Sequence, residues 1–320
     1  MGEETTFSWG GRTDHETEWE RFRYHQIISD EVSQENTCVL IGFCSDEGVR
    51  RNNGRVGAAA APNALRAALA NMAWRLPTGN HLVDAGNIVC EGEQMEKAQQ
   101  ELGVAVKDTL DNESVPIILG GGHETLYGHY LGARSYLGGE KKLGIINIDA
   151  HFDLRPYDEQ SSSGTMFRQI MENDSKAGYL VLGIQRYGNT ESLFQQAEKL
   201  GCEYVCEDEL DEKVWAEAID SFIARHDAVI VTLCMDVVDA SAAPGVSAPS
   251  SFGLDPKVVR SMIRRAVANT KTLSFDIAEV NPSLDPDGRT VKLGAAFVNE
   301  AIVKFATREG ERNGVNSICY

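Results

Sequence analysis

Four short apolar runs of this sequence lead into side chains that can bind a metal ion or pair with a charged substrate. The runs lack strict alternation of polar and apolar residues, as expected for strands buried on both faces of a parallel sheet. In α/β proteins, ligands bind beyond the carboxyl ends of such strands, so the residues that follow each run are the candidates for chemistry. After the runs 115–120, 143–148, 228–233 and 272–277, these candidates are His123; Asp149, His151 and Asp153; Cys234 and Asp236; and Glu279.

Asp149, His151 and Asp153 form the most informative group. In an extended chain, residues i, i+2 and i+4 project to the same side at intervals of about 6–7 Å. Two carboxylates and an imidazole that converge at a buried strand end need a positive partner, which a divalent cation supplies. Alternatively, the three residues lie in a solvated surface loop, but the three further strand ends with ligand-type side chains favour a metal site. A ligand set dominated by carboxylates favours Mn²⁺ over Zn²⁺.

Three glycines, Gly120–Gly122, precede His123 and allow two interpretations. They could cradle a phosphate, but no Lys-Ser/Thr pair follows them, so the P-loop pattern fails. We favour a tight backbone turn that brings His123 close to the same cation. The remaining histidines have no companions at ligand spacing and are expected to be surface or packing residues: His15, His25, His81, His129 and His226.

The elements that must position these residues alternate between strand and helix. The runs 38–43 and 179–184 complete a set of six expected strands. Helical patterns lie between the strands at 62–74, 93–110 and 255–269. This alternation predicts an α/β fold with right-handed crossover connections.

One catalytic domain with an N-terminal extension is the expected organisation. Residues 1–35 are polar and charged with interspersed aromatic residues, which indicates an extension wrapped on the body. No repeat or low-complexity linker divides the rest of the chain, so residues 36–320 are expected to form a single domain.

The composition excludes several classes of partner. Among 320 residues, 30 Lys and Arg stand against 48 Asp and Glu, a formal charge of −18. Such an acidic chain has no sequence-independent affinity for DNA or RNA, and anionic membrane surfaces are disfavoured for the same reason. No run of 18 apolar residues and no secretory signal pattern is present, and seven scattered cysteines suggest reduced thiols. We therefore expect a cytoplasmic protein with a small-molecule substrate.

Four motifs occur in the order and spacing of the arginase/agmatinase superfamily, the binuclear manganese ureohydrolases. They are GGGHET at 120–125, IDAHFD at 148–153, CMDVVD at 234–239 followed by PGVSAP, and DIAEVNP at 276–282. Segments at 9–12, 46–52, 163–169 and 183–190 resemble the formimidoylglutamases of histidine degradation, a branch of that superfamily. The resemblance implies a three-layer α/β/α fold with a mostly parallel sheet of about eight strands, assembled as trimers or hexamers.

The same resemblance implies the metal site and the reaction. Two manganese ions per subunit would share Asp149 and position 234, and a hydroxide between them, at a metal separation of about 3.5–4 Å, would attack an amidine carbon. Asp153 resembles the residue that passes a proton to the departing amine, and Glu279 resembles the carboxylate that pairs with the amidinium. The expected reaction is hydrolysis of N-formimidoyl-L-glutamate to L-glutamate and formamide. The metal ligands implied are His123, Asp149, His151, Asp153, Cys234 and Asp236.

Two positions depart from the general superfamily pattern. Cys234 stands where the superfamily usually has a bridging Asp, so Cys234 is either a thiolate ligand or a small buried residue. Phe167 stands where arginases have a His, which disfavours an arginase and agrees with the formimidoylglutamase pattern. Two alternatives therefore remain: another ureohydrolase that acts on a guanidino acid, and a metal-poor, non-catalytic oligomer.

Substrate charge supplies an argument that is independent of the family. An amidine that carries two carboxylates needs cationic partners, and Arg suits bidentate carboxylate recognition. Arg168 and Arg186 follow two of the expected strands and are predicted to bind the substrate, although both could instead pair with structural acids. The cluster of Arg50, Arg51 and Arg55 could face either the substrate or a subunit interface.

Overall fold

The computed structural model describes residues 7–29, 37–76, 79–158 and 160–308. The expected boundary between the N-terminal extension and the domain, at residues 35 and 36, lies outside the described residues. No helix in the described part of the chain is long and apolar enough to cross a membrane.

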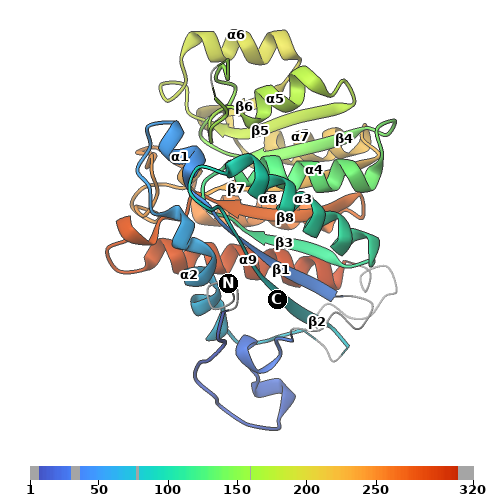
Figure 1. The fold of residues 1–320 in the computed structure, drawn as a ribbon, viewed down its shortest axis with the longest axis vertical. Helices are drawn as coiled ribbons and strands as arrows, with labels where there is room; N and C mark the ends of the chain where they lie inside the picture. The colour runs from blue at the N-terminus through green and yellow to red at the C-terminus, as the bar shows by residue number, and fades with distance from the viewer. Residues whose placement is uncertain (1–6, 30–36, 77–78, 159, 309–320) are drawn as a thin grey trace.

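One sheet of eight parallel strands forms the centre of the described structure, with helices on both faces (Figure 1). The strand order is β2-β1-β3-β8-β7-β4-β5-β6, so β3, β8, β7 and β4 lie side by side in the middle. The strands are β1 Thr37–Cys44, β2 His81–Val89, β3 Val115–Leu119, β4 Leu143–Ile148, β5 Ala177–Ile184, β6 Glu203–Cys206, β7 Ala228–Cys234 and β8 Thr272–Ala278.

The helices form two layers over this sheet (Figure 1). Helices α3, α4 and α5 pack together on one face, whereas α2, α9, α8 and α7 pack in sequence on the other. This arrangement confirms the predicted α/β/α fold. The helices are α1 Glu47–Arg51, α2 Ala61–Ala70, α3 Met95–Asp111, α4 Thr125–Leu137, α5 Met166–Asn173, α6 Glu191–Leu200, α7 Glu212–Ala224, α8 Pro256–Ala268 and α9 Arg289–Thr307.

Continuous apolar runs became strands because the central strands are covered on both faces. Every residue of β4 and β7 is buried, and all six predicted runs are strands. Strand β2 escaped prediction because Asp84 and Gly86 interrupt its apolar pattern, at a point where its register with β1 shifts. Strand β6 has four residues at the sheet edge, too few to give a periodic signal.

The N-terminal segment 7–29 is fastened to the body by aromatic side chains. Tyr24 is buried, and its hydroxyl donates to Asn299 Oδ1 at 2.7 Å. The Trp9 indole donates to Asp84 Oδ2 at 2.7 Å, at the edge formed by α2 and β2. These contacts hold the segment against the body of the protein, and none of its residues lines the cavity described below.

Asp84 also holds a fully buried arginine, Arg66 of α2. Arg66 Nη2 and Nε donate to the two Asp84 oxygens at 2.7 and 2.9 Å, and Nη1 donates to Asn87 Oδ1 at 2.6 Å. We call Trp9, Arg66, Asp84 and Asn87 the Arg66 cluster. Its cation and carboxylate compensate each other within the chain.

Candidate active site

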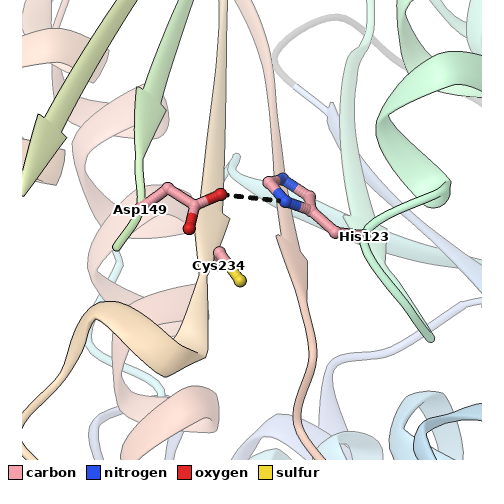
Figure 2. A group of neighbouring side chains, drawn as sticks. All are labelled: His123, Asp149 and Cys234. Atoms are coloured by element: carbon pink, nitrogen blue, oxygen red, sulfur yellow. Dashed lines mark ion pairs between the residues drawn. The ribbon is translucent and has the colours of Figure 1, made fainter. Parts of the chain in front are cut away.

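The carboxyl ends of the four central strands bring the predicted metal-binding side chains together. His123 follows β3, Asp149 follows β4, Cys234 ends β7 and Glu279 follows β8. Figure 2 shows Asp149 joined to His123 by an ion pair, with Cys234 beside them. Parallel strands place their carboxyl ends at one edge of the sheet, so residues far apart in sequence meet there.

Two groups of donor atoms share Asp149. The donor atoms of His123, Asp149 and Cys234 lie within 4.8 Å of one another, and so do those of Asp149, His151 and Asp236. His123 Nδ1 lies 3.1 Å from Asp149 Oδ2, and His151 Nδ1 lies 3.1 Å from Asp236 Oδ2. We call this set, together with Asp153 and Glu279, the acid cluster.

Asp153 joins the first group through the same imidazole nitrogen. Its Oδ2 lies 3.0 Å from His123 Nδ1. No Lys or Arg in the described residues forms an ion pair with any carboxylate of the acid cluster, and the buried Asp236 Oδ1 has no hydrogen-bond partner among them. Buried carboxylates in this excess need a cation from outside the chain, and the donor set of carboxylates, imidazoles and one thiol fits divalent metals.

The backbone of the acid cluster is strained at two residues. Asp153 and Glu279 have φ angles of +51° and +65°, in the left-handed region that side chains other than glycine rarely adopt. Holding a residue in this backbone conformation costs about 1–3 kcal/mol of folding free energy, and such residues are often found at functional sites. Glu279 is secured there because its N–H donates to Gly121 O at 2.8 Å and its Oε1 accepts from the His123 N–H at 2.9 Å.

The glycine turn before His123 allows this close approach. A Cβ at Gly121 would lie 1.8 Å from Ser45 O, so a side chain cannot be accommodated there. The turn therefore requires glycine for close backbone packing, whereas its predicted role in bringing His123 close to a metal ion stays a prediction.

Burial and mutual repulsion shift the acidities of the carboxylates. Burial, and then the charge of Asp149, raise the pKa of Asp153 to about 6. Burial and the nearby Asp236 raise the pKa of Glu279 to about 8. Burial opposes ionisation of Asp149 as well, but hydrogen bonds from His123 and His151 outweigh it and hold the Asp149 pKa below its usual value.

A buried hydrogen-bond network orients His123 from behind. His123 Nε2 lies 3.0 Å from Thr232 Oγ1, and the Thr232 hydroxyl donates to Asp276 Oδ1 at 2.7 Å. Because that hydroxyl proton is committed to Asp276, a neutral His123 donates through Nε2, and its Nδ1 lone pair faces the acid cluster. His129 completes the network, with Nδ1 2.6 Å from Asp276 Oδ2.

The sequence interpretation missed this network. It predicts that His129 is a surface or packing residue. His129 is fully buried, and its carboxylate partner Asp276 was not predicted. Asp276 and Thr232 lie inside runs that were interpreted as apolar strands. The available signal was a charged residue within a strand expected to be buried on both faces, because such a residue needs a partner.

A cavity of about 320 Å³ opens above the acid cluster. His123, His151, Asp153, Cys234, Asp236 and Glu279 line it from the strand ends. Residues 52–55, Arg155, Ser163 and Ser247 line it from the loops. This volume suits a small molecule.

The structure does not bring the two predicted substrate arginines to this cavity. Arg168 lies on α5 and donates through Nε to Glu172 Oε1 at 2.8 Å, one helical turn away. Arg186 donates through Nε to Asp208 at 3.1 Å. Each guanidinium is held by a carboxylate outside the cavity, so this geometry does not support a substrate contact from either residue.

Two other arginines line the cavity instead. Arg55 donates through Nε and Nη2 to the main-chain oxygens of Ser247 and Val246, at 2.9 and 2.8 Å. Among the described residues, neither Arg55 nor Arg155 forms a salt bridge with a carboxylate. The cavity is therefore lined both by carboxylates and imidazoles and by two arginines that form no salt bridge with a carboxylate among the described residues.

Comparison with known proteins agrees with this geometry. The sequence model of the Arginase family matches residues 36–304. The chain belongs to the arginase family. It is 51% identical over 316 residues to the formimidoylglutamase of Geobacillus sp. (strain WCH70), covering 96% of this chain and 97% of that protein. It is 43% identical over 301 residues to the formimidoylglutamase of Nocardia farcinica, with coverage of 92% and 96%.

Solved structures of the arginase family share the fold. The Trypanosoma cruzi formiminoglutamase with Mn²⁺ matches with a TM-score of 0.78 and 25% identity, over 86% of this chain and 94% of that chain. The formimidoylglutamase of Bacillus subtilis matches with a TM-score of 0.80 and 22% identity, over 89% and 92% of the two chains. The predicted resemblance to the formimidoylglutamase branch is thus confirmed, whereas the assignment of individual ligands stays a prediction.

Proposed function

We propose that this protein is a manganese-dependent hydrolase that converts N-formimidoyl-L-glutamate and water into L-glutamate and formamide, in the cytoplasm and as a step of histidine degradation. The observation that carries the proposal is one cavity lined both by the acid cluster and by Arg55 and Arg155, which have no carboxylate partner among the described residues. The identity to curated formimidoylglutamases supports the same substrate. Assembly as a trimer or hexamer forms part of the proposal.

The acid cluster would hold two manganese ions. One ion would take His123, Asp149, Asp153 and Cys234, and the other Asp149, His151, Asp236 and Cys234. Bound manganese would supply a nucleophile by lowering the pKa of water toward neutrality.

Glu279 would pair with the amidinium end of the substrate. The His123 N–H fixes the Glu279 carboxylate through Oε1, so its direction is set by the same turn that carries a metal ligand. Burial and Asp236 raise the pKa of Glu279 to about 8, which shows how strongly this position disfavours an unpaired negative charge. A cationic amidinium at hydrogen-bond distance would compensate that charge.

Asp153 would pass a proton to the departing nitrogen. Water adds to the amidine carbon, the bond from that carbon to the glutamate nitrogen breaks, and the nitrogen gains a proton as formamide leaves. Burial and the Asp149 charge raise the Asp153 pKa to about 6 in the chain without metal. With manganese bound, the proton that Asp153 passes on would be the one released by the attacking water.

Arg55 and Arg155 would bind the carboxylates at the other end of the substrate. The carbonyl groups of Ser247 and Val246 hold the Arg55 guanidinium without neutralising it, so its charge stays available. Charge-assisted hydrogen bonds from Arg to carboxylate are among the stronger polar contacts. In a chain of net charge −18, these two cations would also offset long-range repulsion of an anionic substrate.

A substrate panel tests this assignment. Purified protein with measured manganese content is assayed with N-formimidoyl-L-glutamate, arginine, agmatine and guanidinobutyrate. We expect the first compound to be hydrolysed with a kcat/KM at least about a hundredfold above the others, because cationic arginine and agmatine lack the two-carboxylate end. Preferential hydrolysis of a guanidino compound would assign the protein to another branch, and inactivity on all four at full manganese content would contradict the proposal.

A further inference from the structure

Glu124 is a fully buried carboxylate that the reaction scheme above does not use. It follows His123 directly, and its side chain crosses from the β3–α4 turn to the β1–α1 connection, by which we mean residues 45–48, including the start of α1. There Oε1 accepts hydrogen bonds from the Ser45 hydroxyl at 2.8 Å and from the Gly48 N–H at 3.0 Å. Gln99 Nε2 donates to the Glu124 main-chain oxygen at 2.9 Å and does not contact its carboxylate.

The surrounding backbone is shaped around this carboxylate. A Cβ at Gly48 would lie 2.6 Å from Glu124 Oε2, and a Cβ at Gly122 would lie 2.1 Å from the same atom. Oε2 is buried and has no hydrogen-bond partner among the described residues. A buried oxygen without a hydrogen bond lowers the stability of the fold. Hydrogen bonding alone therefore does not explain why a carboxylate occupies this position.

The segment that Glu124 holds leads directly to one wall of the cavity. Gly48 lies in α1, and the residues that follow this short helix, 52–55, line the cavity and include Arg55. Gly48 O also accepts from the N–H of Ser163, a second cavity residue, at 3.1 Å. Gly48 therefore joins two cavity loops to the turn that carries His123.

We propose that Glu124 is a positioning residue for the substrate's carboxylate end, acting through Gly48 on residues 52–55 and on Ser163. The inference rests on the proposed function, because it assigns these loops to the distal end of N-formimidoyl-L-glutamate. The hydrogen bonds from Ser45 and Gly48 set the distance between the metal-ligand turn and the loops, and hence between the two ends of the substrate. Misplacement of a binding group by about 1 Å can cost up to roughly a hundredfold in rate.

Three variants and one control test the inference. Glu124→Ala removes both hydrogen bonds to the β1–α1 connection, Ser45→Ala removes one, and Glu124→Gln keeps an oxygen that can accept both. Gln99→Ala is the matched control, because Gln99 contacts the Glu124 main chain but not the connection. Each protein is measured for bound manganese, thermal stability, and kcat and KM on N-formimidoyl-L-glutamate and on N-methylformamidine, an amidine without carboxylates.

We expect Glu124→Ala to raise the KM for N-formimidoyl-L-glutamate about ten- to a hundredfold, with manganese content unchanged and kcat within about threefold. Ser45→Ala should raise this KM about three- to tenfold, and Glu124→Gln and Gln99→Ala should leave it within about threefold of the parent. Kinetics on N-methylformamidine should stay within about threefold for every variant. If Glu124→Ala does not fold, the contrast between Ser45→Ala and Glu124→Gln decides.

Three outcomes overturn the inference. They are an unchanged KM in folded Glu124→Ala and Ser45→Ala, equal losses on both substrates, and a loss of manganese that accounts for the loss of activity. Parent protein that fails to hydrolyse N-formimidoyl-L-glutamate would instead contradict the proposed function, so the two failures are distinguishable.

Discussion

Two regions of this molecule bury charged side chains, and they do so in different ways. In the Arg66 cluster, both oxygens of Asp84 accept from Arg66, and Trp9 and Asn87 complete the network. In the acid cluster, buried carboxylates face two imidazoles and a thiol, and Asp236 Oδ1 has no partner among the described residues. The first region has no strained residue with positive φ, whereas the second contains two, Asp153 and Glu279.

The difference teaches how to separate structural from functional burial of charge. A buried ion pair whose partners all belong to the chain contributes to stability only through its own geometry, and removing one partner is costly. A buried set of carboxylates in excess cannot have been retained for stability of the metal-free chain. Such excess, combined with backbone strain, indicates a site completed by cations and substrate from outside.

The largest expected effects come from one substitution in each cluster, Asp153→Asn and Arg66→Ala, which should affect activity and stability in opposite ways. We expect Asp153→Asn to lower kcat roughly a thousandfold or more, because Asp153 is the proposed proton donor as well as a proposed metal ligand. Its metal-free stability should be equal to or above that of the parent. The folded-state pKa of Asp153 is raised to about 6, so ionising this group destabilises the metal-free fold above the unfolded-state pKa, and Asn removes that cost.

Arg66→Ala should show the reverse pattern. Loss of the cation leaves Asp84 without its charged partner, so the free energy of unfolding should fall by about 3–5 kcal/mol, while bound manganese per folded chain stays unchanged. Urea unfolding in the presence of a chelator, with metal analysis of each variant, measures both effects. Strong destabilisation of the metal-free protein by Asp153→Asn would remove the distinction between the two clusters.

The arginines allow the comparison to be extended to substrate binding. Arg55→Ala and Arg155→Ala should each raise the KM for N-formimidoyl-L-glutamate about ten- to a hundredfold, because a charge-assisted carboxylate contact contributes about 1.5–3 kcal/mol. Arg168→Ala serves as control, since Arg168 pairs with Glu172 outside the cavity, and its KM should change less than about threefold. A larger rise in KM from Arg168→Ala than from Arg55→Ala and Arg155→Ala would contradict the proposed binding of the substrate carboxylates by Arg55 and Arg155.

Metal uptake by the acid cluster should depend on pH, whereas the Arg66 cluster should not respond. Burial lowers the pKa of both imidazoles, but hydrogen bonds that His123 donates to Asp149 and Asp153, and the charge of Asp236 beside His151, outweigh burial and raise both pKa values well above the usual value. The Asp153 pKa is about 6. These protons must leave before metal binds, so manganese affinity should fall as pH decreases, by about tenfold per pH unit for each displaced proton. Calorimetric titrations in buffers of different ionisation enthalpy count the released protons; affinity independent of pH would contradict the assigned ligands.

Substitutions of Cys234 should have the smallest effect on metal binding, and they test whether Cys234 is a metal ligand in the acid cluster. If the thiolate is a ligand, Cys234→Asp supplies hard oxygen donors that suit Mn²⁺ and should tighten binding of the weaker ion about three- to tenfold. Cys234→Ser should weaken it, because a hydroxyl stays protonated. Cobalt-loaded parent protein should also show a sulfur-to-metal charge-transfer band that both variants lack, and absence of that band in the parent would place Cys234 outside the coordination sphere.

Much of the fold could be predicted because burial on both sheet faces leaves continuous apolar runs. Strands β2 and β6 could not, since an edge strand that carries Asp84 and a four-residue strand lack that signal. Strand ends also predicted which ligand-type side chains would meet, because parallel strands share one edge. The positions of long side chains depend on loop conformation, which no pattern encodes, so the sequence left Arg55 undecided between the substrate and a subunit interface and did not indicate Arg155.

The pairing of Arg168 with a carboxylate could have been predicted from sequence. Glu172 lies four residues after Arg168, the spacing at which oppositely charged residues pair on a helix. The sequence therefore indicated a carboxylate partner for Arg168 on the same helix. The Thr232–Asp276–His129 network, in contrast, links three separate elements, and its geometry follows only from the packing of α4 against the sheet.

Metal removal and return in one preparation tests the central claim most directly. Protein stripped with a chelator is titrated with Mn²⁺, while bound metal and the formation of L-glutamate and formamide from N-formimidoyl-L-glutamate are followed on the same samples. The account predicts no turnover without metal, turnover that rises with occupancy, and saturation at about two ions per chain. Full turnover by the metal-free protein, or none at two bound ions per chain, would contradict it.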